Sequence, residues 1–449
     1  MRNLALCLIL SCVLLLGAPA QAAEHVVLVS IDGFAAYHLL NAELELPNIR
    51  RLIREGAWAA SSETVFPSVT HPSHTTILTG VEPRLHGVLS NSLTNQKTGE
   101  TFHPTNKPRT EIVTVDTLFD AAKKKGLTTA SFFWPETKDD PSVDFNIPEV
   151  FTDDHKGDIR AVDKSVLDEL TKAGVPIDLY FEWYGSERMT AADMILAEAA
   201  AYTIKTRKPG LLAIHILATD EAQHTYGPHH YEAQAALTNA DACVGKLMEA
   251  VEEAGLEDST TFIVTADHGF HSVEWEMNIR QPFEQAGLLD KIEIGGGGWG
   301  VRIVRKPSFS AADRGKLEQV LEQLEQNPWI NRVIRPDELH ALGLPNFGET
   351  TYANAEYIVL PDIDTYLSVK PGGKPMERVR LAQPSHSHGY LPTHPRMFTS
   401  LLLSGADVRK GALLGHVQNL DIAPTIARVL GLSMPKMSGR VLSEALTTR

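Results

Sequence analysis

Cysteine, long apolar runs and excess basic charge are all scarce in this sequence of 449 residues. Of the three cysteines, Cys7 and Cys12 lie in an N-terminal leader, so Cys243 stands alone and no intramolecular disulfide is expected. After the leader, no stretch approaches the roughly 20 apolar residues that a membrane helix needs. The net charge of -15 provides no basic surface for a nucleic-acid backbone or an anionic membrane. We therefore expect a soluble mature protein without bulk nucleic acid as a partner.

The leader has the pattern of a secretory signal peptide. Met1-Arg2-Asn3 is followed by an apolar run over 4–16 and by the small-x-small sequence Ala20-Gln21-Ala22. We predict a signal peptide at 1–22 and export, with a periplasmic or secreted product. Lipid attachment at Cys12 is disfavoured, because the residue two places before it is not small.

Three apolar runs, each followed by an Asp, are the main signal in the chain. With 43% hydrophobic residues the chain can bury one large core or two, and the runs are typical of parallel strands buried on both faces. Ligands gather outside the carboxyl ends of such strands, where clustered carboxylates would repel one another unless cations neutralise them. The sequence therefore predicts a metal site. The runs and their acids are 26–31 with Asp32, 211–217 with Asp220, and 261–265 with Asp267.

Histidines accompany two of these acids and recur near the C-terminus. His224 follows Asp220 by four residues, so the two side chains can face one ion from a helical turn. His268 directly follows Asp267, and His388 lies in a second histidine cluster before Gly389. Other polar residues are predicted to have no role in the site: His229 and His230 as exposed loop residues, and Asp241 and Cys243 as structural residues of a helix.

Thr70, in Thr-His-Pro, is the candidate nucleophile. A hydroxyl before Pro72 and a helical stretch predicts an N-cap for a helix that ends near Gly80. A helix start favours anions, and a metal ion would lower the pKa of the hydroxyl. An ordinary capping threonine is the alternative. Asn91, in a loop after Pro83, could offer an amide N–H to a bound anion or could be a turn residue.

The remaining pattern predicts an α/β core that is interrupted by an inserted module. The core is assigned to 23–273 and 383–449, and an α+β cap to 274–382, where a glycine tract and short strands appear. The polar, Pro-rich segment 135–176 is interpreted as a surface excursion near the site, without an assigned role. Helices are predicted over 46–56, 116–125, 191–202, 231–254, 313–326 and 419–430, and further strands over 128–134, 301–304, 333–334, 357–360 and 398–403.

The ordered motifs together resemble the nucleotide pyrophosphatase/phosphodiesterase family of the alkaline phosphatase superfamily. The resemblance implies a three-layer sandwich with a central, mostly parallel sheet. It also implies a pair of Zn²⁺ ions, although other divalent transition metals stay open, with Thr70 attacking phosphorus to form a covalent phospho-threonine and Asn91 binding a phosphate oxygen. The implied ligands are Asp220, His224 and His388 for one ion, and Asp32, Asp267, His268 and Thr70 for the other.

Substrate and reaction class stay open at the sequence level. His71 replaces the Phe, and Ser73 the Asn, that nucleotide-cleaving members generally carry, so nucleotides, other phosphodiesters, phospholipid head groups and phosphonates are all candidates. A phosphomonoesterase or phosphonate hydrolase is the alternative, and a non-catalytic metal-dependent binding protein is the rival from another class. A sulfatase is disfavoured because Thr70 stands where a Cys/Ser-x-Pro-x-Arg motif would be needed. The oligomeric state is not predicted.

A preference for phosphodiesters over phosphomonoesters is predicted from charge. A monoester dianion favours an additional cationic clamp, and none of the metal-bearing motifs contains Lys or Arg. Basic residues that folding could still bring to the site are Arg84, Arg280, Lys291 and Arg302.

Overall fold

The computed structural model describes residues 23–447 except 354, 373 and 375. The predicted signal peptide, with Cys7 and Cys12, lies outside the described residues. In the described part of the chain, no helix combines the length and the apolar character needed to cross a membrane.

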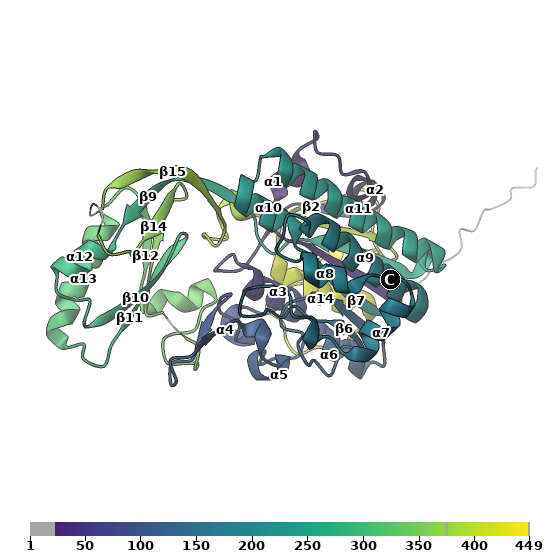
Figure 1. Ribbon diagram of the computed structural model, residues 1–449, viewed down its shortest axis with the longest axis horizontal. Helices are drawn as coiled ribbons and strands as arrows, with labels where there is room; N and C mark the ends of the chain where they lie inside the picture. Colours follow the sequence, from purple (N-terminus) through teal and green to yellow (C-terminus); the bar gives the residue numbers. More distant parts are fainter. Residues whose placement is uncertain (1–22, 354, 373, 375, 448–449) are drawn as a thin grey trace, which may run out of the picture.

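An eight-stranded sheet forms the centre of the larger lobe (Figure 1). Only β16 runs antiparallel to its neighbours, and the other strand pairs are parallel, so the predicted mostly parallel sheet is confirmed. β1 lies between β8 and β7, which brings the three predicted apolar strands side by side. In order across the sheet the strands are β17 (Ala412–Gln418), β2 (Ala57–Glu63), β16 (Leu401–Gly405), β8 (Thr260–Thr265), β1 (His25–Ile31), β7 (Leu211–Ile216), β5 (Thr129–Phe132) and β6 (Phe145–Ile147).

Helices cover both faces of this sheet, which gives the predicted three layers. Alternate residues of β1 belong to two separate cores: Val27 and Val29 to one, Val26 and Leu28 to the other. The first core is completed by α2 (Pro47–Glu55), α7 (Lys164–Lys172), α8 (Ile177–Trp183), α9 (Met189–Arg207) and α11 (Tyr231–Glu253). The second is completed by α3 (Thr70–Thr79), α6 (Leu118–Lys124) and α14 (Ile422–Leu430).

The smaller lobe in Figure 1 is built from residues of the predicted cap. It has its own apolar core between α12, α13 and an antiparallel sheet, and the strands β9 and β15 link it to the larger lobe. These two strands run across the predicted boundaries at 274 and 382; the division into core and cap itself stays a prediction. The elements are β9 (His271–Asn278), α12 (Arg280–Gln285), β10 (Ile292–Gly297), β11 (Gly300–Arg305), α13 (Ala311–Glu325), β12 (Ile330–Ile334), β13 (Tyr357–Pro361), β14 (Thr365–Ser368) and β15 (Arg378–Ser387).

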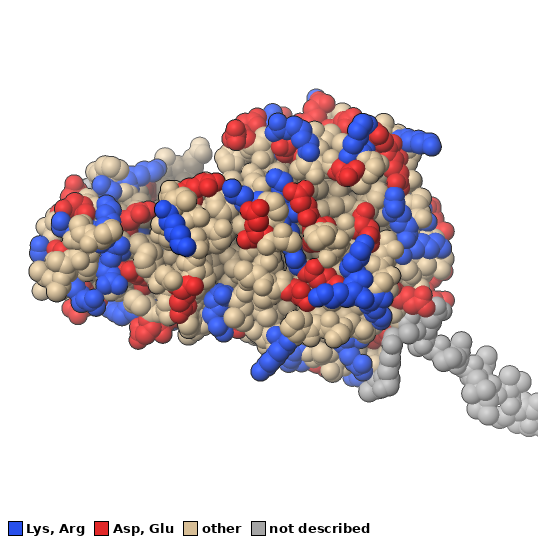
Figure 2. All heavy atoms as spheres, turned by 90° about the horizontal axis from the view of Figure 1, so that it is seen from below, with Lys and Arg blue, Asp and Glu red and all other residues tan. Residues whose placement is uncertain are grey.

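Shorter elements complete the larger lobe. They are α1 (Ala36–Leu40), α4 (Pro83–His86), β3 (Leu93–Thr94), β4 (Thr101–Phe102), α5 (Arg109–Ile112) and α10 (Ala218–Tyr226). On the face drawn in Figure 2, acidic and basic side chains are interspersed, and neither sign gathers into one dominant patch.

Several local predictions need correction. Thr70 is the first residue of α3 and not its N-cap, because the extended Val69 occupies that position. The last core strand begins at Leu401 instead of 398, since Thr399 bridges to Ala35 and Ser62 outside the named strands. The segment 135–176 is not a surface excursion: it contains β6 and α7, and several of its side chains are buried.

Candidate active site

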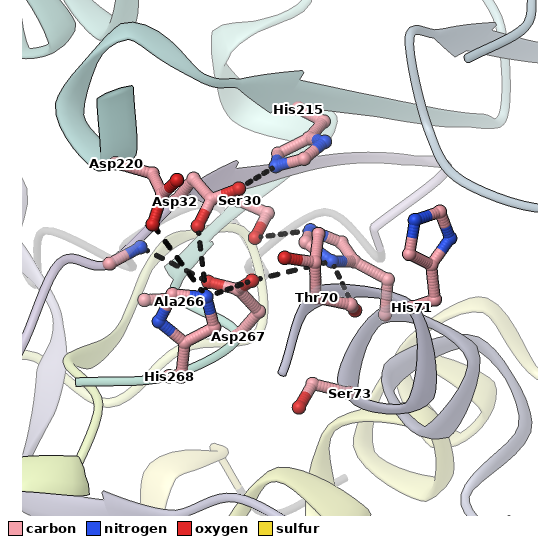
Figure 3. Close-up of polar contacts among 12 residues, drawn as sticks. Ser30, Asp32, Thr70, His71, Ser73, His215, Asp220, Ala266, Asp267 and His268 are labelled. Carbon is pink, nitrogen blue, oxygen red and sulfur yellow. Dashed lines mark hydrogen bonds and ion pairs between the residues drawn. The ribbon is translucent and has the colours of Figure 1, made fainter. Parts of the chain in front are cut away.

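Three aspartates converge at the carboxyl ends of β1, β7 and β8 (Figure 3). Asp32 directly follows β1, and Asp267 follows β8 after one intervening residue. Asp220 lies in the first turn of α10, the helix that follows β7. The Gly33 N–H donates to Asp267 Oδ1 at 3.1 Å, which ties the β1 and β8 ends together. Burial, and then the charges of Asp267 and Asp220, raise the pKa of Asp32 well above its usual value. Burial also raises the pKa of Asp220 to about 6.

Two histidine rings approach these carboxylates. His268 Nε2 lies 3.2 Å from Asp32 Oδ1, 3.2 Å from Asp267 Oδ2 and 4.0 Å from Asp220 Oδ1. His388 Nε2 lies 3.7 Å from Asp220 Oδ1, and the His268 and His388 rings stack with centroids 3.5 Å apart. Folding thus brings together residues that are up to 356 positions apart in the chain.

The backbone sets the tautomer of the predicted histidine ligands. Nδ1 of His268 donates to the Gly269 carbonyl at 3.0 Å, that of His388 to the Ser68 carbonyl at 3.0 Å, and that of His224 to the His386 carbonyl at 2.8 Å. The proton is therefore on Nδ1, and Nε2 keeps its lone pair, as in histidines that bind metal. Burial lowers the pKa of His268 to about 3 and holds the pKa of His388 well below its usual value, which favours the neutral form.

Unpartnered buried atoms mark the centre of the cluster. Among the residues that the structure describes, no hydrogen-bond partner is found for Asp32 Oδ1, Asp267 Oδ2, Asp220 Oδ1 or His268 Nε2. Such atoms are costly when buried unless a ligand satisfies them. These atoms belong to two groups of residues that share His268: Asp220/His268/His388 and Asp32/Asp267/His268. Within each group the ligand atoms lie within 4.8 Å of one another. Mixed carboxylate and imidazole donors of this kind fit Zn²⁺.

The two groups do not divide the residues as the family resemblance implies. His268 lies close to both groups, whereas the resemblance places it on one ion with Asp32 and Asp267. His224 lies at the exposed edge, with Nε2 3.5 Å from Asp220 Oδ2. All six predicted carboxylate and imidazole ligands are nevertheless in one cluster.

Thr70 and Asn91 lie at the start of α3. Thr70 is half-buried, and its carbonyl accepts from His74 Nδ1 at 2.9 Å. The His71 N–H donates to Asn91 Oδ1 at 3.0 Å, which orients the side-chain amide. Among the described residues nothing accepts from Asn91 Nδ2, so this N–H pair is available to an anion. The predicted role of Asn91 as a donor is compatible with this orientation.

A buried network behind the site was missed by sequence reasoning. His215 joins Asp32 to Glu149, with Nε2 3.0 Å from Asp32 Oδ2 and Nδ1 3.1 Å from Glu149 Oε2. His71 Nδ1 lies 2.6 Å from Glu136 Oε1, and its Nε2 lies 3.8 Å from Glu149 Oε1. Burial alone would lower the pKa of His215. Its hydrogen bonds to Asp32 and Glu149, together with the negative charges of these two residues, instead raise the pKa well above its usual value.

Only His215 offered a signal for this network. It is the one polar residue in an otherwise apolar strand, 211–217, and such an interruption marks a buried polar contact. Glu136 and Glu149 fall in a polar, Pro-rich stretch, where acidic residues are usually exposed. They are instead 4% and 1% exposed, so this segment supports the site from behind.

The two residues that depart from the family pattern face the protein interior. The His71 ring points to the side of α3 away from the aspartates (Figure 3) and pairs with Glu136. Ser73 Oγ lies 2.8 Å from Thr64 Oγ1, which in turn donates to the Asp267 carbonyl. Both side chains therefore contact buried residues on the interior side of the site, His71 through Glu136 and Ser73 through Thr64.

The residues predicted to have no role in the site behave as expected. His229 and His230 are exposed. Asp241 accepts from the N–H groups of Asn48 and Ile49 at the start of α2, and Cys243 is buried and unpaired.

The sequence profile of type I phosphodiesterase / nucleotide pyrophosphatase matches residues 26–391. The chain belongs to this family. It is 28% identical over 244 residues to human ectonucleotide pyrophosphatase/phosphodiesterase family member 1, a match that spans 54% of this chain and 23% of the relative. It is 26% identical over 249 residues to venom phosphodiesterase 2 of Crotalus adamanteus, spanning 55% of this chain and 27% of that protein. The matches thus span only about a quarter of these relatives.

Solved structures of the family share the fold. Human ectonucleotide pyrophosphatase/phosphodiesterase 5 superposes with a TM-score of 0.70 at 16% identity, covering 94% of this chain and 100% of that one. The murine protein, as an inactive variant in complex with AMP, superposes with a TM-score of 0.68 at 16% identity and the same coverage. These likenesses confirm the alkaline phosphatase-like α/β fold.

Proposed function

We propose that the chain is a two-zinc hydrolase that cleaves phosphodiester or phosphoanhydride bonds through a covalent intermediate on Thr70. The observation that carries the proposal is the set of unpartnered carboxylate oxygens and imidazole Nε2 atoms that converge beside the first turn of α3. Family membership and the phosphodiesterase names of the relatives support the same activity.

The cluster supports two neighbouring metal positions. Asp220, His224 and His388 would hold one ion, and Asp32, Asp267 and the Thr70 oxygen the other, with His268 close enough to contribute to either. A bound pair of Zn²⁺ ions would supply Lewis-acid stabilisation of charge on the phosphoryl oxygens and lower the pKa of the attacking hydroxyl.

Thr70, Asn91 and His215 have separate roles in the proposed reaction. The Thr70 oxygen attacks phosphorus, the bond from phosphorus to the leaving oxygen breaks, and a phospho-threonine forms; water later attacks phosphorus and releases Thr70. Asn91 Nδ2 donates to a non-bridging phosphate oxygen while His71 N–H holds its Oδ1. His215 keeps Asp32 oriented through their 3.0 Å contact.

Nucleotides and other phosphodiesters are the proposed substrate class. The AMP complex of the murine relative makes nucleotides a natural starting point, and phosphomonoesters and phosphonates are the alternative. Export to the periplasm or the medium is also proposed, on the basis of the leader at 1–22.

Hydrolysis of bis(para-nitrophenyl) phosphate before and after chelation tests the function. We expect turnover that a strong chelator abolishes and Zn²⁺ restores, and a higher kcat/KM than for para-nitrophenyl phosphate. Activity that is unaffected by chelation would contradict the metal site. A clear preference for the monoester would contradict the diesterase assignment alone.

A further inference from the structure

Helix α10 carries two neighbouring rows of polar side chains next to the site. Residues four positions apart lie on the same face of a helix. Asp220 and His224, two predicted metal ligands, form one row, and Thr219 and Gln223 form the row beside it. Both Thr219 and Gln223 are fully buried. Buried polar side chains of this kind are normally bonded to partners on another element.

The carboxyl end of β1 supplies those partners. The Thr219 hydroxyl donates to the Asp32 carbonyl, and Gln223 Nε2 donates to the Gly33 carbonyl at 3.0 Å. Asp32 belongs to the second predicted group of metal ligands and not to the group that α10 contributes to. The row formed by Thr219 and Gln223 therefore joins α10 to the backbone of a ligand in the other group.

Gly33 allows this close contact. Its φ is +68°, and a Cβ atom there would lie 2.7 Å from Gln223 Nε2, so a side chain at this position would displace the Gln223 amide. The N–H of the same glycine donates to Asp267 Oδ1 at 3.1 Å. Gly33 thus bonds to a ligand of one predicted ion through its N–H, and to the helix that carries ligands of the other ion through its carbonyl.

Other contacts hold the strand end and the start of α10 separately. The Asp32 N–H donates to a carbonyl of β7 at 2.9 Å, and Asp32 Oδ2 lies 3.0 Å from His215 Nε2. At the start of α10, the buried Asp193 of α9 accepts from the Ala218 N–H at 2.8 Å. A bond at one end sets where a helix begins, whereas two bonds one turn apart set its rotation about its axis. Loss of the row should therefore displace the ligands on α10 and leave Asp32 in place.

We propose that Thr219 and Gln223 are positioning residues that set the distance between the two predicted metal positions. Their bonds to Asp32 and Gly33 fix the rotation of α10, and with it the places of the two ligands on this helix. The inference rests on the proposed function, which requires two ions close enough to act on one phosphoryl group. Removing either bond should weaken binding of the ion that α10 helps to hold, and should leave the other ion in place.

Zinc binding over a series of buffered free Zn²⁺ concentrations tests this role. Thr219→Val keeps the shape of the side chain and removes its hydroxyl, and Gln223→Met keeps the length and removes the amide. Elemental analysis should find two ions on the unaltered protein. In each variant we expect one binding step to need roughly 10- to 100-fold more free Zn²⁺, while the other step stays unchanged. Asp220→Asn identifies the weakened step, because it removes a ligand on α10 itself.

Two controls separate positioning from a general loss of structure. Thr219→Ser keeps a hydroxyl and should bind both ions as the unaltered protein does. Gln319→Met, at an exposed residue of α13, should change neither step. Equal weakening of both steps in Thr219→Val and Gln223→Met, or a defect in Thr219→Val that Thr219→Ser shares, would overturn the positioning role.

The unaltered protein separates this inference from the proposed function. Two ions bound to it, together with unchanged binding in both Thr219→Val and Gln223→Met, would overturn the inference alone. Failure of the unaltered protein to bind a second ion at any free Zn²⁺ concentration would overturn the two-zinc function, and the inference with it.

Discussion

The hydroxyl of Thr70 is available for chemistry because Val69 occupies the N-cap of α3. A capping threonine would direct its oxygen at the backbone N–H groups of its own helix. As the first helical residue, Thr70 keeps its side chain free of such a bond in the structure. Its place at the helix start remains favourable for an anionic phosphoryl group.

Thr70→Ala should abolish turnover while the fold and the metal content survive. The threonine oxygen is the proposed nucleophile but only one of several ligands, so we expect kcat to fall by at least about 10⁴-fold. Steady-state kinetics with elemental analysis on the same preparation checks this. Thr70→Ser, which keeps a hydroxyl, should retain measurable turnover. Full activity in Thr70→Ala would mean that water attacks directly.

Asn91→Ala should have a milder effect, a loss of roughly 10²- to 10³-fold in kcat, because it removes one donor to the phosphoryl group. Asn91→Asp is the matched test: it can still accept from His71 N–H but places a negative oxygen where the amide donor was. We expect Asn91→Asp to lose at least as much activity. If it were as active as the unaltered protein, Asn91 would not contact the phosphoryl group.

At the scale of elements, the cap is joined to the core by one antiparallel pair of strands. Met277 of β9 lies opposite Arg378 of β15, so the two chain crossings are adjacent in space. The core of the smaller lobe, with α12 and α13, lies beyond this point. The cap can therefore be removed without cutting the large sheet.

Replacing residues 279–376 with a short glycine-rich turn should alter substrate preference and leave metal content unchanged. The predicted metal ligands lie outside the replaced segment, whereas Trp299, which packs against Phe66 beside the Thr70 segment, lies within it. Kinetics on bis(para-nitrophenyl) phosphate and para-nitrophenyl phosphate measure the substrate preference, and elemental analysis measures the metal content. Loss of metal with an unchanged preference would contradict the assignment of this segment as a cap that shapes the pocket.

His86, at the end of α4, makes the fold sensitive to acid. Val88 N–H donates to its Nδ1 at 3.2 Å and its Nε2 lies 3.0 Å from Thr76 Oγ1, and burial holds its pKa at about 3. The unfolded chain takes up this proton near pH 6.5 and the folded chain near pH 3. The free energy of unfolding should therefore fall as pH drops between these values, by up to about 1.4 kcal/mol per pH unit.

Urea unfolding between pH 7 and pH 4 tests this pH dependence. His86→Gln should make the curve of unfolding free energy against pH shallower, even if its stability at pH 7 is lower. His340→Gln, at an exposed histidine, should leave the slope unchanged. Equal slopes for the unaltered protein and His86→Gln would contradict the proposed role of His86.

At the scale of the whole molecule, the proposed metal site draws its carboxylate and imidazole ligands from four segments that are remote in sequence. Without cations, the aspartates of β1, β7 and β8 repel one another at the centre of the fold. We expect the purified protein to contain about two Zn²⁺ or comparable ions and to lose thermal stability on chelation. Elemental analysis and thermal unfolding with and without chelator measure this.

Asp267→Asn should lower both the metal content and the melting temperature of the untreated protein. Asp168→Asn, at an exposed carboxylate of α7, should change neither. Active protein without bound transition metal would contradict the two-metal proposal.

Local sequence patterns were sufficient to identify the parallel strands and the acids at their ends. Continuous apolar runs are required where a strand is covered on both faces, so 26–31, 211–217 and 261–265 could be recognised one by one. Because the carboxyl ends of parallel strands share one edge of the sheet, Asp32, Asp220 and Asp267 could be assigned to a common site from the sequence alone.

Which side chains meet beyond that edge depends on the tertiary structure. His268 lies between the two groups of acids, Glu149 reaches His215 from a polar loop, and Trp299 packs against Phe66 and Gly389. These contacts join residues separated by tens to hundreds of positions. Hydrophobic periodicity reports only which face of an element is buried, so it carries no information on partners brought together by the packing of separate segments.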